Sequence, residues 1–326
     1  MTQRKSKALA LTLALILLAG TLAGCGEGRA AEPEKLQIIA TIFPEYDWVK
    51  QLLGDRAEGA ELTLLLDKGV DMHSYQPSAD DIIRISTCDM FVYVGGKSDG
   101  WVRDALAGAL NKDMVVIDLM EVLGRDVKEE ELVEGMQAEA CEAEPEYDEH
   151  VWLSLKNAAV LCEAIAEGLA DLDPDNAQAY AANAETYRAK LDGLDREYQS
   201  AVDGAAVKTL IFGDRFPFRY LADDYGLDYY AAFPGCSAET EASFETVLFL
   251  AGKLDQLGLK TVLTMEAPRH RIAETIVENT EAKDARILVM DSMQSATAED
   301  AAGGTSYLSV MESNLGVLKA ALKGDG

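Results

Sequence analysis

Residues 173–202, DPDNAQAYAANAETYRAKLDGLDREYQSAV, decide how this chain is organised, because they predict one unusually long helix. Asp173 is a suitable N-cap, and Pro174 fits the first helical turn, where its missing amide hydrogen is not needed. Apolar side chains then recur at alternating spacings of four and three residues and form one stripe: Tyr180, Ala184, Tyr187, Leu191, Leu194 and Tyr198. At a rise of ~1.5 Å per residue the helix would be about 43 Å long, which is enough to bridge two lobes.

Two arrangements would use such a stripe. In a coiled-coil dimer it would pack against a second chain, but residues 173–202 hold only about four heptads inside a globular sequence. The chain has 326 residues, of which 48% are hydrophobic, so it can build two lobes with buried cores. We therefore favour packing of the helix within one chain, and we expect a monomer.

On both sides of this helix, short β-rich apolar runs alternate with helical patterns. The predicted strands are residues 36–42, 60–66, 90–94, 114–118, 208–212, 227–232, 261–265 and 286–290. The predicted helices are residues 45–53, 78–86, 101–110, 153–172, 216–225, 244–257, 270–280 and 306–322. Such alternation is typical of parallel sheets covered on both faces. We predict an α/β fold of two similar lobes, each a parallel sheet flanked by helices, joined by one long rigid helix.

These patterns place an N-terminal lobe at residues 36–173, the linking helix at 174–204 and a C-terminal lobe at 205–326. Residues 124–149 interrupt the alternation, because acids dominate them and strong apolar residues are few. We interpret this stretch as an exposed and partly mobile loop. Its acids could collect cations weakly, but a solvated surface loop is the interpretation that we favour.

The first 24 residues resemble a bacterial lipoprotein signal peptide. Three basic residues near the start precede the apolar run 8–18, and LAGC at 22–25 ends the segment. The resemblance implies cleavage before Cys25, lipid on its sulfur, and a short tether over residues 25–35. We expect an extracytoplasmic protein that is anchored to the cell membrane. The alternative is an ordinary secreted protein with a chance cysteine.

Charge and cysteine content restrict the function further. The net charge of −28, from 57 acids against 29 bases, argues against a nucleic-acid partner. Outside the cytoplasm, disulfides are permitted, and four cysteines allow three complete pairings that the sequence does not distinguish. C-x-x-C spacing is absent, so we do not expect a thiolate zinc site. The four cysteines that follow Cys25 are Cys88, Cys141, Cys162 and Cys236.

Candidate site residues come from the ends of the predicted strands, because open parallel sheets bind ligands beyond the carboxyl ends of their strands. His150 lies instead at the start of a predicted helix. Imidazole and carboxylate groups together suit zinc or manganese. Ligating histidines need an acceptor at the second ring nitrogen, and we expect Asp71 to serve His73 and Asp148 to serve His150. The residues at strand ends are Asp71, His73, Asp214, Arg215, Glu266, His270 and Asp291.

Two stretches resemble known metal motifs. DMHSYQPSADDI (71–82) and DEHVWLSLKNA (148–158) look like the two metal-histidine motifs of zinc/manganese substrate-binding lipoproteins of ABC transporters, the cluster A-I group. The likeness covers nearly the whole chain after the signal segment. It continues through FRYLADDYGL (218–227), SAETEAS (237–243), VMDSM (289–293) and SYLSVMESNLGVL (306–318).

The resemblance implies two α/β lobes with a metal in the cleft. It implies that His73 and His150 are ligands from the N-terminal lobe and that Asp291 is a carboxylate ligand from the C-terminal lobe. The family position that usually holds His or Glu is Arg215 here, and a guanidinium cannot ligate a cation. Three outcomes are open: Asp214 takes over, which we rank first, His270 moves in, or the site has only three protein ligands.

Arg215 could also pair with Asp291 or Glu266 and so weaken or replace the metal. The function that the resemblance implies is capture of zinc, or alternatively manganese, and delivery to an ABC permease without catalysis. Two imidazoles favour zinc over manganese. One alternative is a metal-dependent hydrolase with Glu266 as a base, although G-x-S-x-G and H-E-x-x-H motifs are absent. The other is an adhesion or surface-interaction lipoprotein with a structural metal.

Overall fold

The structure is a computed structural model, which describes residues 35–67, 69–137, 146–237, 241–266 and 269–323. The chain from Leu36 onward forms one unit, and within it are two four-stranded sheets. The predictions for the signal segment, for lipid on Cys25 and for Cys141 fall outside the described residues.

The first sheet lies in the N-terminal lobe and is entirely parallel, with strand order β2-β1-β3-β4. Ile38 in its central strand is opposite Leu62 on one side and Met90 on the other. Both faces are covered by helices, as expected for near-continuous apolar strands. The strands are β1 (Leu36–Ala40), β2 (Ala60–Leu64), β3 (Met90–Tyr93) and β4 (Val115–Asp118). The helices of this lobe are α2 (Phe43–Leu53), α3 (Ala79–Thr87), α4 (Val102–Ala107), α5 (Leu119–Leu123) and α6 (Leu155–Leu172).

The second sheet repeats this arrangement in the C-terminal lobe. It is also parallel, and its order β6-β5-β7-β8 places the second, first, third and fourth strands side by side as in the first sheet. The prediction of two similar α/β lobes is therefore confirmed. The strands are β5 (Thr209–Phe216), β6 (Asp228–Pro234), β7 (Thr261–Thr264) and β8 (Arg286–Val289). The helices are α8 (Arg219–Tyr225), α9 (Phe244–Leu257), α10 (Arg271–Glu278), α11 (Ala298–Ala302) and α12 (Tyr307–Ala321).

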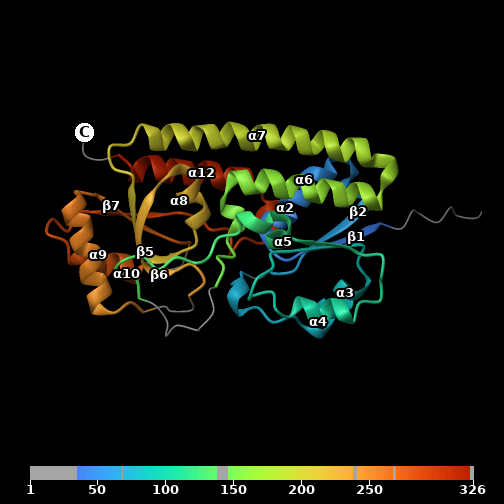
Figure 1. Ribbon diagram of the computed structural model, residues 1–326, viewed down its shortest axis with the longest axis horizontal. Coiled ribbons are helices and arrows are strands. Elements are labelled where there is room, and N and C mark those ends of the chain that lie inside the picture. Colours follow the sequence, from blue (N-terminus) through green and yellow to red (C-terminus); the bar gives the residue numbers. More distant parts are fainter. Residues whose placement is uncertain (1–34, 68, 138–145, 238–240, 267–268, 324–326) are drawn as a thin grey trace, which may run out of the picture. The chain divides into compact units, whose positions relative to one another are not determined.

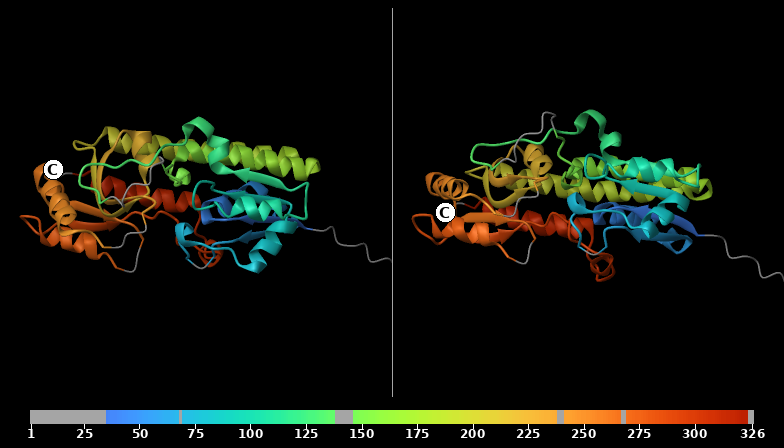
Figure 2. Two further views of the ribbon diagram at one scale, coloured as in Figure 1. Left: turned by 60° about the horizontal axis from the view of Figure 1, so that its bottom comes forward. Right: turned by 90° about the horizontal axis from the view of Figure 1, so that it is seen from below.

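The long helix α7 (Ala177–Asp203) follows a short 3₁₀ turn, Pro174–Asn176, and runs along both lobes (Figures 1 and 2). It contacts α2 and α6 in the N-terminal lobe, and α8 and α12 in the C-terminal lobe. The predicted stripe is the face that α7 buries: Tyr180, Tyr187, Leu191, Leu194 and Tyr198 are all buried, and Ala184 packs against the same core. The stripe therefore serves packing within one chain.

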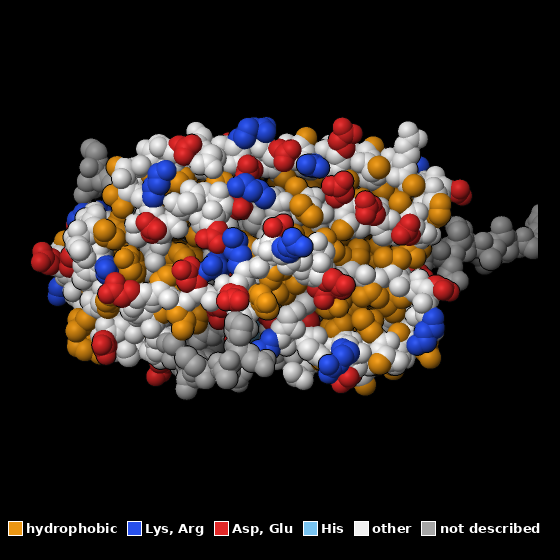
Figure 3. All heavy atoms as spheres, in the orientation of Figure 1, with side chains coloured by type: hydrophobic (Ala, Val, Ile, Leu, Met, Phe, Trp, Pro, Cys, Tyr) orange, Lys and Arg blue, Asp and Glu red, His pale blue; other side chains and the backbone are white. Residues whose placement is uncertain are grey.

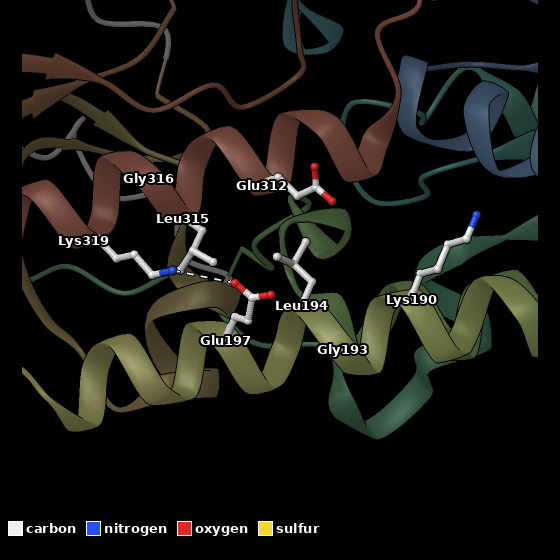
Figure 4. Close-up of a pocket in the computed structure, with 8 residues that line it drawn as sticks. All are labelled: Lys190, Gly193, Leu194, Glu197, Glu312, Leu315, Gly316 and Lys319. Atoms are coloured by element: carbon white, nitrogen blue, oxygen red, sulfur yellow. Dashed lines mark ion pairs between the residues drawn. The ribbon is translucent and has the colours of Figure 1, made fainter.

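Helices α7 and α12 also border a groove of about 450 Å³ (Figure 4). One ion pair, Lys319 to Glu197 at 3.7 Å, spans it. None of the residues that line the groove is one of the predicted site residues.

Strand β5 is longer than predicted, because it continues through Asp214 and Arg215 to Phe216. Its pairing with β6 shifts register between Phe212 and Arg215, and such an irregularity redirects the side chains around it. Gly213 also lets α10 approach, since an added Cβ would lie 2.6 Å from the Cα of Ala273. Asp214 and Arg215 therefore lie in an irregular part of the strand rather than after it. The short helices α5 and α11 were not predicted.

The acidic stretch 124–149 is less exposed than we predicted. The described part crosses to the C-terminal lobe, where the Gln137 amide donates to the Ala232 carbonyl and the Lys128 amide to the Tyr220 hydroxyl. At its end Asp148 and Glu149 are fully buried. Backbone contacts to the second lobe, which sequence periodicity does not encode, hold this segment in place.

Acidic and basic side chains are interspersed across the face shown in Figure 3, so the negative charge there is not concentrated in one patch. Among the helices in the described ranges, none has both the length and the apolar character needed to cross a membrane.

Candidate metal centre

His73 and His150 meet although 77 positions separate them. Their Nε2 atoms lie 3.3 Å apart, and their ring centroids are 5.2 Å apart. His73 is on a 3₁₀ turn, Met72–Ser74, in the segment after β2, and His150 directly precedes a second 3₁₀ turn, Val151–Leu153. The structure thus brings together the two histidines that the motifs single out.

We had predicted that the other ring nitrogen of His73 would contact Asp71, and this prediction is wrong. Its Nδ1 lies 2.8 Å from the Ser98 hydroxyl and 3.4 Å from Oε2 of Glu149. Asp71 instead accepts from the backbone amide of His73 at 3.0 Å, as the cap of the turn. Burial raises the pKa of Glu149, but the contacts with His73 and Ser98 outweigh this effect and lower the pKa.

His150 is more deeply buried than His73. Its side chain is 0% exposed, and Oδ1 of Asp148 lies 2.8 Å from its backbone nitrogen and 2.9 Å from ring Nδ1. The contact that we predicted between Asp148 and His150 is present. The Tyr220 hydroxyl donates to the carbonyl of Asp148 and fixes this segment to α8. Because Nδ1 is occupied, Nε2 is the nitrogen of His150 that remains for a ligand.

Cys236 is the third member of this group, and the sequence analysis missed it. Within the described ranges, one group of at least three potential ligand side chains has all its ligand atoms within 4.8 Å of one another, and it consists of His73, His150 and Cys236. Cys236 lies two residues after β6, at the carboxyl edge of the second sheet. The position of Cys236 just after a predicted strand could therefore have identified it. Only carboxylates and histidines were considered at strand ends, and thiols were judged by C-x-x-C spacing alone.

The surroundings of Cys236 are acidic. Its amide donates to Oε1 of Glu130 at 2.8 Å. Burial raises the pKa of the Cys236 thiol well above its usual value, and Asp148, Glu130 and Glu149 add to this effect. Cys88, Cys162 and Cys236 are all free thiols, so none of these three forms a disulfide.

Arg215 pairs with a residue that we did not predict. Its guanidinium lies 2.7 Å from Oδ2 of Asp71 and also donates to the carbonyl of Ser237 at 3.2 Å. The predicted pairing with Asp291 or Glu266 is therefore wrong, because the irregular end of β5 points this side chain at the loop before His73. Burial raises the pKa of Asp71, but the charge of Arg215 outweighs this effect and lowers it.

Asp214 and His270 lie outside the three-residue group. Oδ2 of Asp214 accepts from the Thr264 hydroxyl at 2.8 Å, and its Oδ1 accepts from the Arg215 amide. Nδ1 of His270 is 3.3 Å from the same hydroxyl of Thr264. These contacts tie both side chains to the end of β7.

Asp291 and Glu266 are also outside that group. Oδ1 of Asp291 accepts from the Met293 amide at 2.7 Å, and burial raises the pKa of Asp291. Glu266 accepts hydrogen bonds from Ser292 and from the Gln294 amide, so it fastens the loop after β8. Burial raises the pKa of Glu266, and the negative charge of Asp291 adds to this rise.

Comparison with known proteins identifies one family. The family model described as "zinc-uptake complex component A periplasmic" matches residues 38–321. The chain is 31% identical over 309 residues to the zinc-binding lipoprotein AdcA of Streptococcus pneumoniae serotype 4, and the match covers 94% of this chain. It covers only 59% of AdcA, so this chain spans less than two thirds of that relative's length.

A second relative matches along nearly its whole length. The chain is 29% identical over 306 residues to the high-affinity zinc uptake system protein ZnuA of Bacillus subtilis, covering 92% of this chain and 93% of that protein. Among solved structures, the Zn(II)-bound ZnuA-like domain of pneumococcal AdcA is similar with a TM-score of 0.70 and 30% identity. That match covers 88% of this chain and 99% of the domain.

Proposed function

This chain belongs to the family of the zinc-uptake complex component A, and we propose that it captures zinc outside the cell and delivers it to an ABC-type permease. The His73–His150 pair is the observation that carries the proposal. With Zn–N distances of ~2.0–2.1 Å, two nitrogens of a tetrahedral zinc site lie about 3.3–3.4 Å apart. The two Nε2 atoms are 3.3 Å apart. The pair therefore has the spacing that zinc requires.

The surroundings of the pair support capture of an ion rather than catalysis. Each histidine has its Nδ1 next to an oxygen acceptor, which orients the ring and raises its basicity. A hydrolase would need a base beside the metal, but Glu266 accepts hydrogen bonds from Ser292 and Gln294 in a loop outside the histidine group. We infer that the metal is cargo and that the protein breaks no bond.

The ligand set from the C-terminal lobe stays a proposal. The family resemblance supports Asp291 as one ligand. Asp214 remains a candidate, although both of its oxygens accept hydrogen bonds within its own lobe. Two imidazoles favour zinc over manganese as the cargo.

Membrane attachment is likewise proposed. The sequence at 22–25 supports cleavage before Cys25 and a lipid anchor there, with residues 25–35 as the tether. An anchored protein of this kind would meet its permease at the outer surface of the membrane. We propose that it acts there as a monomer, because α7 buries its apolar stripe within one chain.

The test is metal analysis and calorimetry on a soluble form that begins at Gly26. Wild type should copurify with zinc and bind it more tightly than manganese, whereas a His73→Ala/His150→Ala double variant should bind neither. His270→Ala is the comparison variant, because the His270 ring contacts Thr264 rather than the histidine pair, and zinc binding kept in this variant would assign the loss in the double variant to His73 and His150. Equal and weak uptake of both metals by wild type and double variant would remove the proposal.

The same preparation separates the alternatives. If the metal were structural, as in a metal-stabilised adhesion protein, a chelator should unfold the chain rather than only remove the metal from its site. Circular dichroism before and after chelation distinguishes the two results. Ester or phosphoester turnover that vanished on chelation would instead favour a hydrolase.

A further inference from the structure

We propose that Cys236, two residues after β6, is the third protein ligand of the captured metal, and that Arg215 of β5, whose guanidinium cannot ligate a cation, is not a ligand. This inference rests on the proposed function, because it assigns a ligand to the same site. A thiolate from the C-terminal lobe would join two imidazoles from the N-terminal lobe. The site would then be specific for zinc and similarly soft cations.

The distances support this assignment. The ligand atoms of Cys236, His73 and His150 all lie within 4.8 Å of one another. With Zn–S of ~2.3 Å and Zn–N of ~2.0–2.1 Å, tetrahedral zinc places sulfur about 3.6 Å from each nitrogen. A shift of about 1.2 Å or less would therefore bring the thiol into position.

Gly235 is what allows the thiol to come so close. A Cβ at this position would lie 3.1 Å from Nδ1 and Cε1 of His150 and 2.9 Å from the Phe216 carbonyl oxygen. Any larger residue would therefore push the Cys236 loop away from the His150 ring. The absence of a side chain at Gly235 places Cys236 next to the histidine pair.

Arg215 fastens both ligand-bearing loops. One guanidinium contacts Asp71, two residues before His73, and the carbonyl of Ser237, one residue after Cys236. The Cys236 amide is held separately by Glu130. Arg215 thus acts as a positioning residue, and the thiol is preorganised before a metal arrives.

A thiolate changes which metals the site accepts. Sulfur ligands prefer zinc and softer ions, whereas manganese prefers carboxylate and water oxygens. Cys88 and Cys162 are buried outside this group and cannot take the role.

Cobalt provides a direct test, because a thiolate bound to Co²⁺ gives a charge-transfer band that imidazole and carboxylate ligands do not give. We would load the full chain, purified in detergent, with Co²⁺ and record its near-ultraviolet and visible spectra. The variants are Cys236→Ser, which is nearly isosteric, and Cys141→Ser, which is the matched thiol control. Circular dichroism of the metal-free proteins checks that each variant is folded.

Wild type and Cys141→Ser should show both the charge-transfer band and the visible d–d bands of bound cobalt. Cys236→Ser should lose the charge-transfer band and keep the visible d–d bands. The zinc affinity of Cys236→Ser should fall at least about tenfold, since even residues that only orient a ligand typically cost that much. The ratio of zinc affinity to manganese affinity should also be smaller in Cys236→Ser than in wild type. Cobalt bound to wild type without the charge-transfer band would overturn the role of Cys236 and leave zinc capture intact. Failure of wild type to bind cobalt or zinc at all would overturn both proposals.

Discussion

The guanidinium of Arg215 and the carboxylate of Asp71 lie 2.7 Å apart and join the two lobes beside the histidine pair. The side chains are 18% and 31% exposed, so water screens the pair only in part. In Arg215→Met we expect the free energy of unfolding to fall by about 1 kcal/mol, since partly exposed pairs contribute little. Zinc affinity should fall as well, because the loops of His73 and Cys236 lose their common anchor.

Urea denaturation and zinc titration of Arg215→Met check this prediction. Arg103→Met is the control, because Arg103 and Asp104 form a pair that is 88% and 87% exposed. The pKa of Asp71 is lowered in the folded protein, so the pair stabilises the fold when Asp71 is ionised. The loss of unfolding free energy in Arg215→Met should therefore be present at neutral pH and disappear as the pH falls below about 4. Equal effects of the two variants would contradict a specific role for Arg215.

Asp148 should tune the metal through His150. Asp148→Asn keeps the shape of the side chain but removes the negative charge beside ring Nδ1. We expect zinc affinity to fall by about 10- to 100-fold, as for other outer acceptors of metal-bound histidines. A competition titration with a zinc chelator measures this change. Glu146→Gln, at a partly exposed acid nearby, should leave the affinity unchanged.

The linking helix offers a matched pair of hydroxyl deletions. Tyr198 is buried and its hydroxyl donates to the Met311 carbonyl at 2.6 Å, which ties α7 to α12. Tyr198→Phe should lower the free energy of unfolding by about 1 kcal/mol, because a buried hydrogen bond between α7 and α12 is lost. The Tyr187 hydroxyl, also buried on α7, has no hydrogen-bond partner among the residues that the structure describes, so Tyr187→Phe should be neutral or stabilising. Denaturant unfolding of both variants tests the difference, and equal losses would contradict it.

Asp99 should make stability depend on pH. The pKa of Asp99 is raised to about 7, chiefly by burial and also by the charge of Glu149, while the Gly95 amide, which donates to Oδ2, opposes the rise. A carboxyl with a raised pKa stabilises the fold when protonated, so the free energy of unfolding should fall as the pH rises from about 4 to about 7.

Asp99→Asn should flatten this dependence and stabilise the protein above pH 7 relative to wild type. Urea unfolding at about pH 5 and about pH 8 measures the slope. Glu45, which is fully buried with a raised pKa, acts in the same direction and should leave a smaller residual slope. Asp104→Asn, at an exposed carboxylate, should reproduce the wild-type slope.

The parts of the fold that were predictable are those with short-range signals. Apolar runs located all eight strands of the described ranges, and the spacing of Tyr180 to Tyr198 located α7 and its buried face. The end of β5 was missed because it contains a register shift against β6, in a segment that packs closely against Ala273, which is distant in sequence. The two histidines were recoverable because their motifs are local.

Partners across the site were not predictable in the same way. Asp71 is the acid nearest to His73 in sequence, but Arg215 of the other lobe engages one of its oxygens. The ring of His73 then turns to Ser98 and Glu149, which two other loops supply. Cys236 joins the group only because the order of the strands puts the end of β6 beside the N-terminal lobe. Strand order is a property of the whole chain that local patterns do not contain.

The two histidines differ in exposure, and this difference gives the site a direction. His73 is 11% exposed, whereas His150 is 0% exposed. An arriving ion would therefore bind His73 first, exchanging a coordinated water for the imidazole, and would bind His150 second. A departing ion would leave His150 first and His73 last. Changes around His73 should then alter how fast the metal exchanges, while changes around His150 should alter how tightly it is held.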